Sequence, residues 1–351
     1  MSITTRPFDK APTGEQVTEF ILTNKHGASI SVIDFGGCLR NIIVPDRDGN
    51  LADVNLGFDN VDTYDGKSNS MGALIGRVGN RIGGASFELD GVTYNLFKND
   101  GENNLHSGPK GVDRYVWASE TVEGDGWDKL ILTHTTPDGD CGFPGAVSME
   151  VTYSWNDEGE LGIHYFATTD KTTLVNMTNH AYFNLDGHDT PDVRDLTLQI
   201  NAPAVNEVDD GLIPTGVLLK SETLPYGFAT EARVGDVLAL TDVIPAMKKC
   251  GGVDFNYCAG RDKEMKTIAV LKSPKTGRVM EVITDQPGVQ CYTGQGLNHE
   301  GKGGAHYGKY AGLCLETQHY PDAIHQPQFH SIVLRPEDTY DTTTIYKFYA
   351  E

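Results

Sequence analysis

The feature that most constrains this chain is a repeated alternation of apolar and polar residues. Residues 148–155 read SMEVTYSW and residues 196–201 read LTLQIN, and in both stretches every second side chain is apolar. Successive side chains of a β-strand point to opposite faces of a sheet, so this period gathers the apolar residues on one face. Both stretches are therefore predicted to be strands with one buried face.

A second local signal predicts a β-hairpin. Residues 86–96 read SFELDGVTYNL, in which Asp90 and Gly91 separate two short alternating runs. An Asp-Gly pair suits the two-residue turn of a hairpin, because that turn requires positive φ at both positions. We therefore expect two antiparallel strands joined at Asp90 and Gly91.

Helical signals are weak along the whole sequence. The 40 glycines and 16 prolines are scattered as turn residues, and no long apolar stripe follows the helical period. A doubly wound α/β fold would need helices alternating with apolar strands. We expect an all-β protein built as packed sheets or a barrel. All-β domains of more than about 200 residues are common, so 351 residues allow one domain or two.

The charge balance limits the possible partners. The chain has 49 acidic and 28 basic residues, a formal net charge of −21. That charge repels nucleic acid and anionic membranes, so neither is expected as a partner. No apolar run approaches the roughly 20 residues of a membrane span, and residues 1–10, MSITTRPFDK, do not resemble a signal peptide.

The six cysteines are sparse and form no Cys-x-x-Cys pair. A disulfide-stapled domain would carry them more densely, so free thiols in a reducing compartment are expected. Together with the missing signal peptide, this usage predicts a soluble, cytoplasmic protein.

Polar side chains gather beside glycines in several distant segments. Each segment alone is a weak signal, because a glycine-flanked polar residue is usually a solvated turn residue. Only convergence of the segments on one site would give them a common chemistry. They are residues 76–84, 103–117, 178–185, 251–257, 289–298 and 315–329.

Three kinds of site can be weighed on these residues. Residues 76–84, GRVGNRIGG, superficially resemble a phosphate-binding loop, but they lack its spacing and lead into the hairpin, so a nucleotide site is rejected. His106, His180 and Glu316 have the residue types of a two-histidine, one-carboxylate metal site, although no close ligand spacing supports one. Asp254 and Glu316 could be the paired carboxylates of a glycosidase.

Read together and in order, the segments resemble the aldose 1-epimerase (galactose mutarotase) family along nearly the whole chain. The matching motifs are GRVGNRI, NNLHSGPKGVDRYVW, NHAYFNL, GLIPTG, VDFNY and LETQHYPDAIHQPQF. The resemblance implies a large antiparallel β-sandwich of the galactose-mutarotase type, a supersandwich, formed by residues 1–351 as one domain. It also implies interconversion of the α and β anomers of free aldohexoses such as D-galactose and D-glucose, without cofactor or metal.

That reaction needs an acid and a base beside the anomeric carbon. Ring opening removes the proton of the C1 hydroxyl and protonates the ring oxygen O5, after which the ring recloses on the other face of the aldehyde. The resemblance implies that Glu316 is the base and His180 the acid, so activity is expected to peak with Glu316 ionised and His180 protonated. The residues that it implies hold the sugar are His106, Arg81, Asn80, Asp254, Gln290 and Tyr182.

The sequence departs from the family pattern in two places. Residues 68–76, SNSMGALIG, replace an aromatic-rich approach, and Ser107 stands where the family usually has glycine. The serine would matter if the backbone there needed positive φ. His319 and His325 are expected to make structural hydrogen bonds.

Two other functions on the same fold are alternatives. A phosphosugar 1-epimerase would need a cluster of cations for the phosphate, which the acidic composition disfavours. A non-catalytic carbohydrate-binding protein would be expected to lose Glu316 or His180, and the chain keeps both. The expected partner is the sugar alone, bound by a monomer or homodimer.

Overall fold

The alternating stretches are strands of one large sheet. The computed structural model describes residues 2–66, 69–124, 126–260 and 263–351. In β13 (Val147–Asn156), Met149, Val151 and Tyr153 are buried while the intervening side chains are exposed or half-buried. In β17 (Thr197–Ile200), Leu198 and Ile200 are buried in the same way. Both predicted strands are thus confirmed.

The large sheet has nine strands, and every neighbouring pair in it is antiparallel. The strand that comes last in the sequence, β29, lies near its middle, between β14 and β23. In spatial order, the strands are β11 (Ala118–Val122), β12 (Trp127–Thr136), β13, β14 (Glu160–Thr169), β29 (Tyr340–Ala350), β23 (Arg278–Thr284), β22 (Lys266–Lys272), β17 and β20 (Ala232–Arg233).

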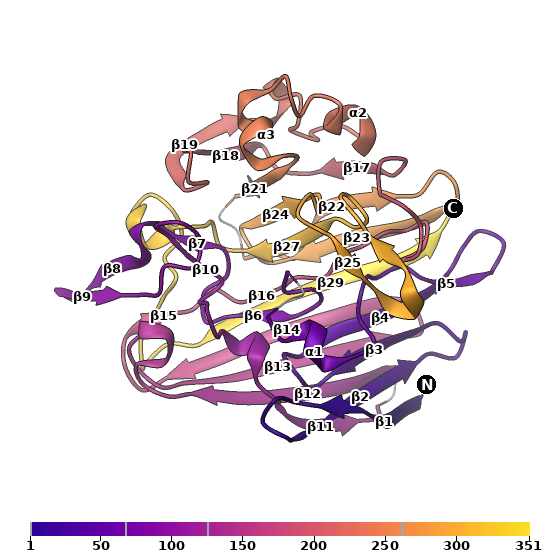
Figure 1. The fold of residues 1–351 in the computed structure, drawn as a ribbon, viewed down its shortest axis with the longest axis horizontal. Helices are drawn as coiled ribbons and strands as arrows, with labels where there is room; N and C mark the ends of the chain where they lie inside the picture. Colours follow the sequence, from indigo (N-terminus) through magenta and orange to yellow (C-terminus); the bar gives the residue numbers. More distant parts are fainter. Residues whose placement is uncertain (1, 67–68, 125, 261–262) are drawn as a thin grey trace.

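Two five-stranded antiparallel sheets lie against the nine-stranded sheet (Figure 1). In the view of Figure 1 the first is at the bottom and the second near the top. The first contains β1 (Ser2–Lys10), β2 (Gln16–Thr23), β3 (Ser29–Ile33), β4 (Cys38–Pro45) and β5 (Leu51–Asp53). The second contains, in spatial order, β19 (Pro214–Lys220), β18 (Ala204–Val208), β21 (Asp254–Cys258), β24 (Gly288–Tyr292) and β27 (Cys314–Gln318).

The main hydrophobic core fills the space between these layers. One continuous cluster joins Val32 of the first small sheet, Leu132 and Tyr153 of the large sheet, and Phe255 and Val289 of the second small sheet. All five side chains are essentially inaccessible to solvent. Because face-to-face packing of sheets defines a sandwich, the predicted all-β supersandwich is confirmed.

Short elements connect the sheets and complete the surface. The helices are α1 (Val61–Tyr64), α2 (Val234–Leu238) and α3 (Pro245–Cys250), with single 3-10 turns at Gly83–Ala85, Val112–Arg114, Asp140–Gly142, Ser221–Thr223, Lys302–Gly304 and Ala323–His325. Among the described residues, no helix has the length and apolarity required to cross a bilayer. The two-stranded pairs are β6 (Leu74–Ile75) with β16 (Thr178–Asn179), β7 (Arg81–Ile82) with β10 (Asn104–Leu105), β8 (Ser86–Leu89) with β9 (Val92–Asn95), β15 (Thr173–Leu174) with β28 (Val333–Leu334), and β25 (His299–Glu300) with β26 (His306–Tyr307).

The hairpin prediction is confirmed by β8 and β9. Their turn consists of Asp90 at φ 50° and Gly91 at φ 78°, the positive values that the Asp-Gly pair predicts. The glycine-rich segment before it forms a 3-10 turn at Gly83–Ala85 and then enters this hairpin.

Candidate active site

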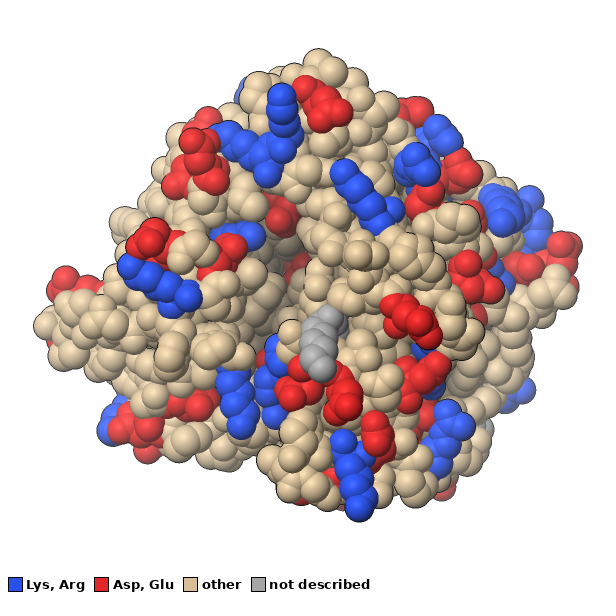
Figure 2. Space-filling view, viewed as in Figure 1, with Lys and Arg blue, Asp and Glu red and all other residues tan. Residues whose placement is uncertain are grey.

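A cavity of about 250 Å³ brings the distant polar segments together. Figure 2 shows the molecule hollowed near the middle of the face that it presents, with acidic and basic side chains around the hollow. All eight site residues predicted from the sequence line the cavity. The full lining is Asn69, Ser70, Asn80, Arg81, Leu105, His106, His180, Tyr182, Asp254, Gln290, Tyr292 and Glu316.

The second small sheet supplies a polar row on the cavity side. Gln290 of β24 pairs in register with Glu316 of β27, and Asp254 lies on the neighbouring strand β21. The Gln290 Nε2 group donates a hydrogen bond of 2.6 Å to Asp254 Oδ1. Such neighbours on adjacent strands share a face of the sheet, so three polar side chains are held side by side by backbone pairing.

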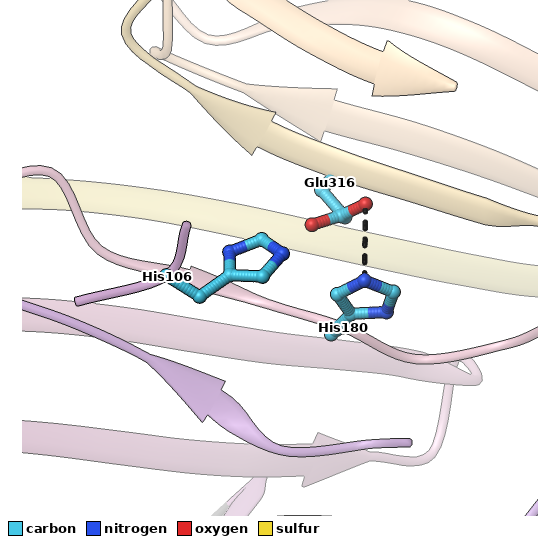
Figure 3. A group of neighbouring side chains, drawn as sticks. All are labelled: His106, His180 and Glu316. Carbon is cyan, nitrogen blue, oxygen red and sulfur yellow. Dashed lines mark ion pairs between the residues drawn. The ribbon is translucent and has the colours of Figure 1, made fainter. Parts of the chain in front are cut away.

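Glu316 and His180 form the centre of the site (Figure 3). His180 Nε2 lies 3.7 Å from Glu316 Oε1. The two residues are only 6% and 2% exposed, so neither is well solvated. The ring of His180 stacks on Tyr182, with centroids 5.0 Å apart and planes 30° apart, which fixes its orientation.

Burial shifts the proton affinities of this pair in opposite directions. It raises the pKa of the Glu316 carboxyl well above its usual range, and the nearby charge of Asp254 adds to the rise. It lowers the pKa of His180 to about 4. Because burial disfavours both charged forms, it favours the arrangement in which Glu316 holds the proton and His180 is neutral.

His106 is held beside this pair by a strained turn. The backbone amide of Asn80 donates to His106 Nδ1 at 3.0 Å, so the neutral ring carries its hydrogen on Nε2. Burial lowers the pKa of His106 well below its ordinary value, which keeps the ring neutral. Asn80 and His106 have φ values of 59° and 54°, a conformation that only the surrounding contacts can maintain.

Ser107 shows why a glycine could be replaced here. Its φ is 57°, so this position does require the left-handed conformation that favours glycine. Its hydroxyl accepts from the Val78 amide at 2.9 Å and donates to the Val78 carbonyl at 3.1 Å. These two bonds stabilise serine in a conformation that costs most side chains free energy.

The pair and the adjacent His106 also have the donor types of a metal site. Ligand atoms of His106, His180 and Glu316 all lie within 4.8 Å of one another. Two histidines and one carboxylate are a set that divalent iron or zinc accepts. The expectation that the protein works without metal remains a prediction, which chelation can test.

His319 and His325 lie outside the cavity lining. His325 Nδ1 contacts Asp322 Oδ1 at 2.7 Å, the structural hydrogen bond expected for it. The backbone of His319 is fixed by the Asn176 side chain, and its ring lines a separate groove with Gln286. Neither residue is among those that surround Glu316.

The fold and the buried pair together define a carbohydrate isomerase. Residues 18–347 match the family model described as aldose 1-epimerase, and the chain belongs to this family. The galactose mutarotase of Bos taurus is 38% identical, with 99% of each chain covered. The aldose 1-epimerase of Escherichia coli is 32% identical over 97% of this chain and 98% of its own length. The solved galactose 1-epimerase of Lactobacillus acidophilus is 26% identical with a TM-score of 0.86, covering 99% of both chains.

The sequence reasoning missed several residues at the site. Asn69, Ser70, Leu105 and Tyr292 line the cavity without having been predicted. Tyr292 follows Gln290 by two residues in β24, so the alternation of that strand could have indicated it. The Asn69 and Ser70 backbones have positive φ in a loop rich in Gly, Ser and Asn, a composition that predicts a turn but not its place beside the site.

Asp100 is a further residue that sequence reasoning missed. Arg81 Nε donates to Asp100 Oδ2 at 2.7 Å, and Arg81 lines the cavity together with Asp254. Because the Asp100 carboxylate accepts the hydrogen bond from Nε, the two terminal nitrogens of Arg81 are left for a ligand. Asp100 thus orients the single Lys or Arg side chain among the described lining residues.

We expect Asp100→Ala to weaken substrate binding more than turnover. A freely rotating Arg81 must be ordered when the sugar binds, so KM should rise by about 3- to 10-fold, the equivalent of about 1 kcal/mol, with kcat changed by less than twofold. Initial rates over a range of sugar concentrations measure both constants. Asp100→Asn, whose amide oxygen can still accept from Nε, is the matched control and should have a nearly normal KM. A lower kcat with an unchanged KM in Asp100→Ala would contradict this role.

Proposed function

We propose that this protein interconverts the α and β anomers of free aldohexoses, with D-galactose and D-glucose as substrates. The observation that carries the proposal is the buried His180–Glu316 pair, 3.7 Å apart in a cavity lined by hydroxyl-binding groups. Full-length relatives named galactose mutarotase and aldose 1-epimerase support the same reaction.

In the proposed mechanism, Glu316 acts at the C1 hydroxyl and His180 at O5. The Glu316 carboxylate takes the C1 hydroxyl proton while the C1–O5 bond breaks, and protonated His180 gives its Nε2 proton to O5. The open aldehyde turns about its C1–C2 bond. Reclosure then returns a proton from Glu316 to O1 and one from O5 to His180, so no proton is gained or lost overall.

The resting pair differs from the reactive pair only in the place of one proton. Burial leaves that proton on Glu316, whereas opening starts with it on His180. Transfer from the carboxyl group to Nε2 converts one form into the other. Ring opening uses ionised Glu316 and protonated His180, and reclosure uses protonated Glu316 and neutral His180. A pair that shares one proton therefore suits a reversible isomerisation.

The remaining residues of the cavity are proposed to hold the sugar. Arg81 and Asp254 offer charged contacts to ring hydroxyls, and Gln290 and Asn80 offer amide groups. The neutral His106 presents Nε2–H toward the region around O5, and Tyr182 supplies a flat apolar wall under His180.

The proton-sharing pair predicts the pH dependence of activity. Below pH about 4, His180 binds a second proton while Glu316 still holds one, and the two-proton pair has no base. Far above the ordinary glutamate pKa, the last proton is lost and the pair has no acid. We therefore expect the acidic limb of kcat/KM near pH 4, below the usual histidine pKa of about 6.5, and the basic limb above the ordinary glutamate range. An acidic limb centred near pH 6.5 would contradict this assignment.

Optical rotation of freshly dissolved sugar tests the function itself. The purified protein in EDTA should speed the equilibration of α-D-galactose and α-D-glucose far beyond the rate in buffer, and the ratio of the two kcat/KM values ranks the sugars. Activity that EDTA abolishes and a divalent metal restores would contradict the metal-free mechanism. A wild type that accelerates neither sugar would contradict the function. Acceleration limited to a phosphorylated hexose would indicate the phosphosugar alternative.

The organisation proposed for this activity is one domain in a reducing compartment, with no partner protein required. We propose that residues 1–351 act as one domain, supported by the continuous core between the three main sheets. All six cysteines are unpaired, which supports a reducing, cytoplasmic location. We propose a monomer or homodimer whose only required partner is the sugar.

A further inference from the structure

The two ring nitrogens of His180 face two residues of the same strand. Nε2 faces Glu316, and Nδ1 lies 3.4 Å from the sulfur of Cys314. Cys314 and Glu316 are two positions apart in β27, so their side chains leave the same face of the sheet. The proposed mechanism uses only the Glu316 side of the ring, and the Cys314 side has no role in it.

We propose that Cys314 is a positioning residue whose sulfur accepts a hydrogen bond from His180 Nδ1–H and thereby keeps Nε2 free to exchange protons with Glu316. This inference rests on the proposed function, because it concerns the histidine assigned there as the acid. In the neutral ring only one nitrogen carries hydrogen. With that hydrogen on Nδ1, the Nε2 lone pair points at the protonated carboxyl of Glu316.

The surroundings of Cys314 favour this arrangement. The thiol is fully buried, and burial raises its pKa well above the ordinary value, so it remains a neutral thiol. The Tyr182 hydroxyl is the other hydrogen-bonding group at the sulfur, and because it donates to the Asn69 carbonyl at 3.1 Å, its oxygen can accept the thiol hydrogen. The sulfur lone pairs are then left for Nδ1–H.

The backbone carbonyl of His180 is a second acceptor near its own ring. It accepts from the Gly72 amide at 2.8 Å and has another lone pair, and because it can only accept, it favours the same tautomer, with hydrogen on Nδ1. The stacking of the ring on Tyr182 holds its plane, which keeps Nδ1 at the sulfur and Nε2 at the carboxyl. A thiol that donated to Nδ1 would instead place the hydrogen on Nε2, where it would block transfer from Glu316.

A sulfur acceptor at Nδ1 also suits the proposed role of His180 as an acid. A carboxylate at this position, as in many catalytic histidine pairs, would stabilise the imidazolium ion strongly. Sulfur is a weak acceptor and stabilises it little. The transfer itself is balanced: the O–H bond of Glu316 breaks, the N–H bond at Nε2 forms, and a carboxylate and an imidazolium result.

Nitrogen-15 NMR of the full-length protein tests the inference without using activity. Protein labelled at its 11 histidines would be recorded at pH 7, with the His180 signals identified by their loss in His180→Asn. We expect a protonated Nδ1 and an unprotonated Nε2 in the wild type. A protonated Nε2 would overturn the inference, even if the enzyme is fully active. An inactive wild type with protonated Nδ1 would overturn the proposed function and leave this assignment standing.

Variants of Cys314 connect the hydrogen bond to turnover. Cys314→Ala should lower kcat by about 10-fold with little change in KM, a part of the 10²- to 10⁴-fold that a placed proton transfer provides. Cys314→Ser retains an acceptor and should keep both the Nδ1–H signal and most of kcat. Cys38→Ala, at another buried cysteine, is the control and should match wild type. Unchanged kcat and an unchanged spectrum in Cys314→Ala would overturn the inference.

Discussion

Replacing Glu316 with glutamine should lower kcat for anomer interconversion by about 10²- to 10⁴-fold, the usual contribution of a positioned acid–base group. The amide has nearly the same shape as the carboxyl group but cannot take up the C1 hydroxyl proton. Glu316 is 2% exposed and carries a raised pKa, so an uncharged amide should fit its site without unfolding the protein. KM should change far less than kcat, because the groups proposed to hold the ring hydroxyls remain.

Polarimetry with α-D-galactose measures this effect, and circular dichroism verifies the fold of the variant. Glu300→Gln, at an exposed glutamate of β25, is the matched control and should retain wild-type rates. A Glu316→Gln protein with normal kcat would exclude Glu316 as the base. A rise in KM alone would make it a binding residue.

His180→Asn should cause a loss of kcat of similar size, again about 10²- to 10⁴-fold. Asparagine can still make hydrogen bonds, but it cannot give a proton to O5 near neutral pH. His180 and Glu316 exchange a single proton, so they should behave as one unit in kinetics. The double variant should therefore be little slower than either single variant, far from the product of the two effects.

Rates of the two single variants and the double variant test this coupling. His26→Asn, at an exposed histidine in the turn between β2 and β3, should leave kcat unchanged. Multiplicative losses in the double variant would show that the two side chains act independently. Normal turnover in His180→Asn would require a different acid, and His106 would be the first candidate, because its ring lies beside that of His180 with centroids 5.4 Å apart.

The fold could be predicted from the sequence where periodicity was strong. The alternation in residues 148–155 predicts β13, and the Asp90–Gly91 pair predicts the hairpin, because both signals arise within a few neighbouring residues. The order of strands in the nine-stranded sheet has no such local signal. It depends on long-range packing, as when β29 inserts between β14 and β23.

The site required the family resemblance as well as the residues. His106, His180 and Glu316 are more than 70 positions apart from one another in the sequence, and no spacing rule brings them within 4.8 Å. Motifs identified the residues, but they contain no information on burial, so the opposite pKa shifts of Glu316 and His180 were not predictable. Asp100 was missed because its role depends on one contact with Arg81.

The central position of β29 affects how the chain can fold during synthesis. β14 and β23 each pair with β29 along one edge, and β29 alone joins them, so the nine-stranded sheet remains in two unconnected parts until residues 340–350 are available. Until then, the edges of β14 and β23 are unpaired, and such edges promote aggregation. A ribosome-bound chain lacking these residues therefore exposes two strand edges that the finished sheet covers, and we expect chaperones to bind such a chain.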